Sequence, residues 1–373
     1  MKNRIKILYI VSTLKRCGPT NQLFNIVSNL DEDLFDRKVL TLSSETPDSL
    51  KPKFEEAGII VESLNLGRLF GFIFGWNRLL SKVKSFKPDV IHTQGVRADN
   101  YALRLKAEGI KSVATIRCIP HEDYPMQYGK VLGVNMANNH LKTLKGLNVV
   151  AAVSQSISNA LAKNSLKTVT IQNGCDISKY TPVSPEKKQL LRSKLNLPQE
   201  KIVLISVGHL SNRKDPITII RAFKEVKDPQ KYELIFVGDG EIKTQCMSEA
   251  ENYKNIQFIG RVPNVDEYLQ ASDVFISASL SEGLPNSVLE SLACNVPTIL
   301  SNIPQHKEIF EGYPQYKDCF FNISDSLGLT EILDNLNLNY YQGLPCRSIV
   351  EKNFNARAMS FEYQGIYKNL IKE

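Results

Sequence analysis

The sequence lacks the signatures of several common functional classes. Its seven cysteines are far apart and none has a partner at metal or redox spacing, which indicates reduced, partly buried thiols. No G-x-G-x-x-G follows the first predicted strand, residues 6–12, and Gly238-Asp239-Gly240 does not supply one, so an NAD-dependent enzyme is not indicated. The apolar part of the N-terminus is too short to span a membrane and is expected to form that strand. No aromatic–basic alternation indicates nucleic-acid binding.

Charge is unevenly distributed along the 373 residues, whose formal net charge is +7. Residues 1–180 contain 25 Lys and Arg against 15 Asp and Glu, whereas the remainder contains 21 against 24. A basic half favours anionic partners such as nucleotide phosphates or an anionic membrane face. Within it, Leu66–Lys84 places aromatic residues such as Phe70 and Trp76 beside basic ones. This pattern predicts peripheral membrane contact; the alternative is a core-packed helix whose lysines extend to solvent.

Predicted strands and helices alternate through both halves. The predicted strands are residues 6–12, 36–42, 59–64, 89–92, 112–117, 148–154, 201–207, 233–237, 256–259, 273–278 and 296–300. The predicted helices are residues 21–30, 50–57, 76–84, 100–108, 216–226, 242–251, 265–270, 286–294 and 356–371. This alternation is typical of α/β domains with a parallel, doubly wound sheet. A proline-punctuated link at residues 180–185 predicts the boundary between two Rossmann-like domains, residues 1–182 and 183–355.

The most informative stretch is S-E-G-L-P-N-S-V-L-E, residues 281–290, which joins a predicted strand to a helix beginning at Asn286. Gly283 allows a tight turn, and Pro285 suits the start of the helix. The N-terminus of a helix after a parallel strand is suited to bind an anion. Glu282 lies in the loop and Glu290 one turn into the helix, facing the same side as the loop. One carboxylate could hold a ribose diol and the other a sugar hydroxyl; the alternative is a βαβ unit with two surface glutamates.

The form E-G-L-P-N-S-V-L-E resembles the E-x7-E signature of the retaining GT-B glycosyltransferases of family 4. The resemblance extends to N-G-C-D at 173–176, V-G-H-L-S-N-R-K-D-P at 207–216, V-G-D-G-E at 237–241 and the run from 258 to 309. It implies the GT-B fold, in which two Rossmann-like domains face each other across a cleft. It also implies that the last helix, within residues 356–373, crosses back onto the first domain.

The resemblance further implies roles for particular residues. Lys214 would bind the donor diphosphate, aided by Arg213, the Gly18 amide and the Gly208 loop, while Glu290 would bind the nucleotide ribose. Fixed cations there would stabilise the charge that develops on the diphosphate leaving group. The donor sugar would be held by the loop and first helical turn, namely Glu282, Gly283, Leu284, Pro285, Asn286 and Ser287.

Two departures from the family pattern stand out. His209 replaces the arginine that usually follows the glycine. It is expected among the donor-binding residues but would be only partly charged at neutral pH. Only Gly18 remains of the two glycines usual after the first strand, and Pro19 has no N–H to offer. An ordinary strand–helix turn at Gly18, a solvated Lys214 and a non-functional His209 are the alternatives.

A polar loop is expected after residue 117, with His, Glu, Asp and Tyr in residues 118–124. Either Arg117 or His121 is expected to occupy the position of a family histidine that touches the donor sugar, so both are catalytic candidates with Glu282 and Lys214. His92, Arg97 and His121 are candidates for acceptor binding. No acidic pair with metal spacing is evident, so neither a metal nor a cofactor is expected.

The favoured hypothesis is a metal-independent retaining hexosyl- or N-acetylhexosaminyltransferase. It would move a sugar from a nucleotide-diphosphate donor, UDP-linked, to an acceptor hydroxyl in bacterial cell-surface polysaccharide synthesis. The acceptor would be a glycan or lipid-linked glycan, and the enzyme would be cytoplasmic, in peripheral contact with the membrane. The alternatives are a catalytically inactive glycosyltransferase-like scaffold subunit and a GT-B sugar-nucleotide epimerase.

Overall fold

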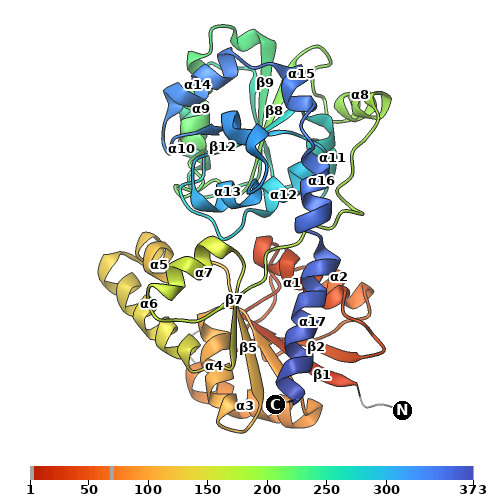
Figure 1. Ribbon diagram of the computed structural model, residues 1–373. Helices are drawn as coiled ribbons and strands as arrows, with labels where there is room; N and C mark the ends of the chain where they lie inside the picture. Colours follow the sequence, from red (N-terminus) through yellow and green to blue (C-terminus); the bar gives the residue numbers. More distant parts are fainter. Residues whose placement is uncertain (1–3, 68–70, 373) are drawn as a thin grey trace. The chain divides into compact units, whose positions relative to one another are not determined.

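The computed structural model describes residues 4–67 and 71–372, which form two compact α/β units. Unit 1 comprises Met1–Gly174 and Ala356–Glu373, and unit 2 comprises Cys175–Asn355. Each unit contains one parallel sheet with helices on both faces, which can be followed by the strand and helix labels in Figure 1. Among the described residues, no helix combines the length and apolar character needed to cross a bilayer.

Unit 1 contains a seven-stranded sheet in the order β3-β2-β1-β4-β5-β6-β7. Its strands are β1 (Ile5–Val11), β2 (Phe35–Thr41), β3 (Ile60–Ser63), β4 (Val90–Thr93), β5 (Lys111–Ile116), β6 (Val149–Ala152) and β7 (Val169–Thr170). Its helices are α1 (Gly18–Ser28), α2 (Lys51–Glu56), α3 (Gly71–Phe86), α4 (Val96–Lys106), α5 (Pro120–Tyr128), α6 (Lys130–Lys145), α7 (Gln155–Ala162) and α17 (Ala356–Lys372). The strands are apolar on both faces because each face is covered by its own hydrophobic core.

The last helix of the chain, α17, packs in unit 1 against α1 and the sheet. The hydroxyl of Tyr367 lies 3.1 Å from that of Tyr9 and 2.6 Å from Nδ1 of His92, whose Nε2 lies 2.7 Å from the hydroxyl of Thr115. Tyr363 also bonds Thr115, at 2.8 Å. His92 is therefore fully buried with both ring nitrogens bonded, and burial lowers its pKa to about 3. This contradicts the prediction that His92 binds the acceptor: it is a neutral core residue that anchors α17.

Unit 2 contains a six-stranded sheet in the order β10-β9-β8-β11-β12-β13. Its strands are β8 (Ile202–Val207), β9 (Tyr232–Val237), β10 (Ile256–Gly260), β11 (Val274–Ser277), β12 (Thr298–Ser301) and β13 (Phe320–Phe321). Its helices are α8 (Pro185–Lys194), α9 (Pro216–Glu225), η1 (Pro229–Lys231), α10 (Lys243–Glu249), α11 (Val265–Ala271), α12 (Asn286–Ala293), α13 (Pro304–Ile309), η2 (Pro314–Cys319), α14 (Ser326–Asp334), α15 (Leu338–Gln342) and α16 (Cys346–Asn353). One continuous core fills it.

The chain passes between the units at two neighbouring points, after Gly174 and before Ala356. The Cys175 amide donates to the Phe354 carbonyl at 2.7 Å, and Arg347 donates to the Tyr180 carbonyl at 2.9 Å. These bonds tie residues 175–180 to α16. Unit 2 therefore begins earlier than the prolines near residue 182 predict.

The residues between β5 and β6 differ from the sequence prediction. Residues 118–124 were expected to be a loop, but Pro120 begins α5, which Gly129 ends before α6 starts. Gly129 has φ 82°, a conformation that glycine adopts without strain. Pro125 within α5 and the glycine and asparagines of α6 are weak helix formers, so tertiary packing rather than propensity sets this helical hairpin.

Candidate active site

The candidate site lies where the central strands β8 and β11 of unit 2 end. These strands pair in parallel, so the loops that follow them meet at one edge of the sheet. Ligands in open α/β sheets bind at the carboxyl ends of the strands. The first loop contains residues 208–215 and the second residues 278–285, and the Leu280 amide joins them by donating to the Arg213 carbonyl at 2.8 Å.

A sharp turn places Arg213 and Lys214 over the strand ends. Asp215 has φ 45° and caps α9 by accepting from the amide and hydroxyl of Thr218 at 3.3 and 2.7 Å. Pro216 occupies the first turn of that helix, where its missing N–H is not needed. The local sequence thus ends the loop at a defined point and fixes the two cations just before it.

Glycines allow the loop after β8 to pack closely on the loop after β9. Gly238 has φ 147°, and a Cβ there would lie 1.8 Å from the Gly208 carbonyl oxygen. A Cβ at Gly240 would lie 2.1 Å from the Leu210 carbonyl oxygen. The V-G-D-G run at 237–240 is therefore required by packing, and it supports the loop that carries Lys214.

Glu282 lies between the two cations. It is 7% exposed, and its carboxylate accepts from Lys214 Nζ, from Arg213 Nη1 at 3.0 Å and from the Ser279 hydroxyl at 2.8 Å. Burial alone raises the pKa of Glu282, but Lys214 and Arg213 outweigh it and lower the pKa to about 2. The cluster contains one carboxylate and two cations, and is therefore net positive at neutral pH.

Glu290 has a different environment, half-buried on α12. Burial raises its pKa to about 7, although Lys179 and a hydrogen bond from the Tyr180 hydroxyl favour its ionised form. The Nζ of Lys179 lies 3.6 Å from Oδ1 of Asp266, so Lys179 interacts with two carboxyl groups, those of Asp266 and Glu290. Glu290 also interacts electrostatically with Lys214, which places both glutamates around one group of charges. A carboxyl whose pKa burial raises to about 7 is typical of a functional site.

The residues between the two glutamates form the turn into α12. Leu284 and Pro285 are buried, and α12 begins at Asn286 with Pro285 as its N-cap. Ser287 lies in the first turn, where amide hydrogens have no partner inside the helix. The turn after Gly283 therefore points an electropositive helix end toward the side of the sheet where Glu282 lies.

His209 points away from this cluster. Its Nδ1 donates to the Asp239 carbonyl at 2.6 Å, and its Nε2 lies 2.7 Å from the carboxylate of Glu241. Half of the side chain is exposed. The cation that lies beside Lys214 on Glu282 is Arg213, while the polar contacts of His209 are with Asp239 and Glu241.

In unit 1, Arg117 lies at the end of β5 near the loop before α1, which begins at Gly18. Its guanidinium donates to Gln94 at 3.2 Å and to Asn173 at 2.7 Å, and it interacts with Cys17. His121 lies on α5, where it bonds Asn138 of α6 at 2.8 Å. Of the two catalytic candidates, Arg117 is therefore the one that shares the carboxyl edge of the sheet with the Gly18 turn.

Several buried donors at this edge have no hydrogen-bond partner within the described part of the chain. They are Arg117 Nη2, Gln94 Nε2 and Arg97 Nη2; the other end of the Arg97 guanidinium donates to Ser43 at 2.8 Å. Unpaired buried donors are costly unless a ligand or water accepts from them. Arg97 thus remains a candidate for acceptor binding, together with Arg117.

Sequence reasoning missed three residues of the unit 2 site. Ser279 bonds Glu282, Tyr180 bonds Glu290, and the buried His306 interacts electrostatically with Glu282. Ser301 connects Ser279 with His306. Its hydroxyl donates to the Ser279 carbonyl at 2.6 Å, and its backbone carbonyl accepts from His306 Nδ1 at 2.8 Å. Tyr180 lies in the stretch interpreted as a linker and gave no signal. Ser279 lies three residues before Glu282, and this proximity was the available signal.

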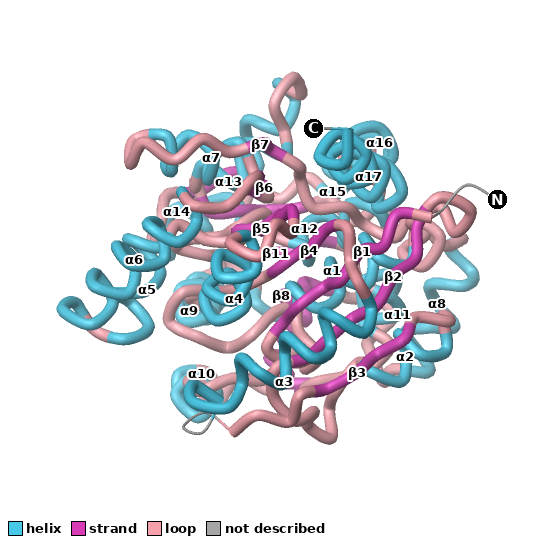
Figure 2. Tube along the Cα trace, turned by 90° about the horizontal axis from the view of Figure 1, so that it is seen from below, coloured by secondary structure: helices cyan, strands magenta, loops and turns pink. Residues whose placement is uncertain are grey.

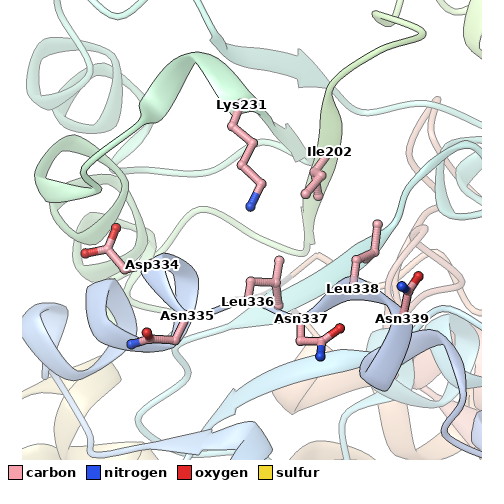
Figure 3. Close-up of a pocket in the computed structure, with 8 residues that line it drawn as sticks. All are labelled: Ile202, Lys231, Asp334, Asn335, Leu336, Asn337, Leu338 and Asn339. Atoms are coloured by element: carbon pink, nitrogen blue, oxygen red, sulfur yellow. The ribbon is translucent and has the colours of Figure 1, made fainter.

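A pocket of unit 2 lies away from this cluster. It has a volume of about 500 Å³ and is lined by Ile202, Lys231 and residues 334–339. Figure 3 shows Lys231 extending into it. Ile202 begins β8, so this pocket lies at the opposite end of the strand from Glu282. No group of three or more His, Cys, Asp or Glu in the described ranges could hold a metal ion.

Comparisons with known proteins cover almost the whole chain. Residues 187–314 match the glycosyl transferases group 1, and residues 18–179 match glycosyltransferase family 4. The O-antigen biosynthesis glycosyltransferase WclY of Escherichia coli is 25% identical over 378 residues, covering 99% of each chain. The UDP-Gal:alpha-D-GlcNAc-diphosphoundecaprenol alpha-1,3-galactosyltransferase of E. coli is 28% identical over 221 residues, or 55% of each chain.

A solved structure shares the fold of the chain. Anabaena HepE in complex with UDP and glucose aligns with a TM-score of 0.81 at 18% identity, covering 98% of this chain and 100% of that one. The predicted GT-B architecture is thereby confirmed, as is the predicted family. The chain belongs to family 4 of the GT-B glycosyltransferases and is a glycosyltransferase.

Proposed function

We propose that this glycosyltransferase transfers a sugar from a UDP-sugar to a hydroxyl of a lipid-linked glycan, with retention of anomeric configuration and without a metal ion. The product would be a bacterial surface polysaccharide, and the reaction would occur at the cytoplasmic face of the membrane. The observation that carries the proposal is Glu282 between Arg213 and Lys214 at the strand ends, with Glu290 beside them. The names of WclY, the galactosyltransferase and HepE supply the donor and acceptor classes.

The donor can be fitted to these groups by their hydrogen-bonding capacity. Lys214 has three donors and Arg213 five, so each can hold Glu282 and still donate to a phosphate oxygen. The Glu282 carboxylate accepts from a sugar hydroxyl, and Glu290 accepts from the ribose diol. The amides at the start of α12 add donors directed at anionic oxygens.

In the proposed reaction the acceptor oxygen bonds to the anomeric carbon on the face from which UDP leaves. The bond from that carbon to the β-phosphate oxygen breaks, and the leaving phosphate takes the acceptor proton. Lys214 and Arg213 stabilise the negative charge that gathers on the phosphate as this bond breaks. For unit 1, the proposal assigns acceptor binding to Arg97 and Arg117, through the guanidinium nitrogens that have no hydrogen-bond partner among the described residues.

An inactive binding subunit is the second candidate. His209 favours it, because it stands where the family pattern has an arginine and its imidazole contacts Asp239 and Glu241. Incubation of the purified protein with a panel of UDP-sugars and a lipid-linked acceptor extract separates the two. UDP release that depends on the acceptor is expected. Binding of UDP without turnover of any donor would support the inactive subunit, and conversion of the free UDP-sugar without acceptor would indicate an epimerase.

Two glutamine variants test the assigned roles within that assay. Glu290→Gln is expected to weaken UDP binding by roughly 1.5–3 kcal/mol, because it removes a charge-assisted hydrogen bond. Glu282→Gln is expected to lower turnover while UDP still binds. Unchanged UDP affinity in Glu290→Gln, measured by titration calorimetry, would remove Glu290 from the nucleotide site.

A further inference from the structure

The turn between α5 and α6 exposes a cluster of large apolar side chains. Val131 is 79% exposed and Leu132 is 57% exposed. Met126, Tyr128 and Val134 are also exposed, and these five residues form the α5–α6 tip. Among the described residues, no other stretch of nine contains as many exposed large apolar side chains. Single exposed apolar residues are ordinary on protein surfaces, but a contiguous group indicates a surface that contacts an apolar phase.

The tip is held rigidly by the rest of unit 1. At Gly133 the two helices cross so closely that a Cβ would lie 2.4 Å from the Pro125 nitrogen. The Tyr124 hydroxyl bonds His140 Nδ1 at 2.7 Å, and His140 Nε2 donates to Asp99 at 2.8 Å. This buried chain fixes both helices to α4. The apolar side chains are therefore presented outward by a fixed hairpin, and α5 and α6 lie side by side at one edge of the fold in both views (Figure 1 and Figure 2).

From Tyr124 onward the charged residues of α5 and α6 are all basic, whereas Glu122 near the start of α5 is acidic and exposed. From Tyr124 to Cys175 the sequence contains no Asp or Glu in 52 residues, yet it contains five lysines. All five are exposed: Lys130, Lys142, Lys145, Lys163 and Lys167. Lys130 lies within the tip itself, between Tyr128 and Val131. Exposed lysines attract anionic lipid headgroups, while apolar and tyrosine side chains suit the boundary between headgroups and acyl chains.

We propose that the α5–α6 tip is a membrane-docking surface that inserts Val131 and Leu132 shallowly into an anionic bilayer. The proposal rests on the proposed function, because a lipid-linked acceptor is available only at a membrane. The combination of apolar insertion and lysine attraction produces reversible, salt-sensitive attachment. The occupant is an anionic lipid bilayer; an interface with a second copy of the chain is the competing outcome.

This surface differs from the one predicted within Leu66–Lys84. Residues 68–70 of that stretch, including Phe70, lie outside the described residues. Trp76 packs on Tyr101 with ring centroids 6.4 Å apart, and Arg104 covers its ring at 3.9 Å. The Trp76 side chain is therefore engaged with α4, as the alternative of a packed helix predicts.

Sedimentation of the full-length protein with vesicles tests the proposal. The vesicles contain phosphatidylcholine alone or phosphatidylcholine with phosphatidylglycerol. The test variant is Val131→Ser/Leu132→Ser, and the matched control is Leu190→Ser/Leu327→Ser, which removes two equally exposed leucines from unit 2. Lys130→Glu tests the charge.

Wild type and control are expected to bind the anionic vesicles at low salt and to be released at high salt. The double tip variant is expected to bind on the order of tenfold more weakly, and Lys130→Glu on the order of tenfold more weakly at low salt. Equal binding by the tip variant and wild type, or no binding by wild type, would overturn the proposal. So would a wild-type dimer in gel filtration that the tip variant converts to monomer, since it would show an interface between copies.

UDP titration of the same preparations separates the two proposals. A protein that binds UDP but not vesicles refutes the docking surface and leaves the proposed function intact. A wild-type protein that fails to bind UDP refutes the proposed function whatever the vesicles show.

Discussion

Replacing Glu282 and Glu290 separately by glutamine is expected to change the stability of the free protein in opposite directions. Both residues are glutamates of one site, yet their folded-state pKa values are about 2 and about 7, against an ordinary value of 4.5. Glutamine mimics the neutral carboxylic acid in each place. The two substitutions therefore measure what each negative charge contributes to the fold.

Ionised Glu282 stabilises the fold. Its pKa is lower in the folded state, so the contribution is fully present above pH 4.5 and is lost as the pH falls toward 2. A change in pKa from 4.5 to about 2 corresponds to roughly 3 kcal/mol. Glu282→Gln also leaves Arg213 and Lys214 without their partner, which adds to the cost. The variant is expected to lose roughly 3 kcal/mol of unfolding free energy at neutral pH.

Ionised Glu290 destabilises the fold. Its pKa is higher in the folded state, so the bound proton contributes stability below pH 4.5, and this is lost as the pH rises through about 7. The cost of the charge is roughly 3 kcal/mol at about pH 8 and below about 1 kcal/mol at about pH 5. Glu290→Gln is therefore expected to be more stable than wild type at pH 8, with a smaller difference at pH 5.

Urea unfolding at pH 5 and pH 8 measures both effects. Glu251→Gln is the matched control, because Glu251 is exposed on unit 2, where a substitution should change stability by less than about 0.5 kcal/mol. Shifts of the same sign for Glu282→Gln and Glu290→Gln would refute the reasoning. So would a gain in Glu290→Gln that does not grow between pH 5 and pH 8.

Three further predictions concern the same site. UDP affinity, measured by calorimetry, should rise about tenfold between about pH 6 and pH 8 as Glu290 ionises. Glu290→Gln should lose this pH dependence, and an identical dependence in both proteins would contradict the assignment of Glu290. Lys214→Ala should lower turnover by about tenfold or more. It should also lower the melting temperature, because Lys214 is paired with the buried Glu282 and is not a solvated loop lysine. Unchanged specific activity of the folded fraction would show that Lys214 is purely structural. Gly238→Ala should cost about 1–3 kcal/mol by overpacking against the Gly208 carbonyl. Gly365→Ala on α17, where an added Cβ would meet no atom within 4 Å, should be neutral or stabilising; equal stabilities of the two variants in urea would contradict this.

Activity is expected to persist in excess EDTA, since cations and helix amides are proposed to bind the diphosphate. The assay is UDP release from the preferred donor with and without chelator. Complete loss that Mg²⁺ restores would reveal a metal site and contradict the proposed mechanism.

Local sequence determined much of the protein. Continuous apolar runs predicted the bounds of most strands of both sheets to within one or two residues, because strands buried on both faces are apolar throughout. The stretch from Glu282 to Glu290 predicted the turn into α12 and the start of that helix at Asn286, directly after Pro285. Its resemblance to a family then singled out Glu282, Glu290 and Lys214, which remain the predicted donor-binding residues.

Tertiary structure decided how each polar side chain is used. His92 was expected to bind the acceptor, but α17 returns from the far end of the chain and buries it under Tyr363 and Tyr367. His209 was expected near the diphosphate, but the loop after β9 engages it through Asp239. Neither partner is near in sequence, so no local pattern could reveal these contacts.

The two glutamates show the same division most clearly. Sequence places them eight positions apart on one loop and helix, and nothing in that spacing distinguishes their charges. Only the fold brings Lys214 and Arg213 onto Glu282, while Glu290 lies half-buried near the Tyr180 hydroxyl and Lys179. The α5–α6 tip also depends on tertiary contacts. Its weak helix formers fold into a helical hairpin because Gly133 lets α6 approach α5 closely and His140 bonds to Asp99 of α4. This packing leaves the side chains of Val131 and Leu132 exposed to solvent. Electrostatic environment and exposure are set by groups distant in the chain, so they follow from the tertiary structure alone.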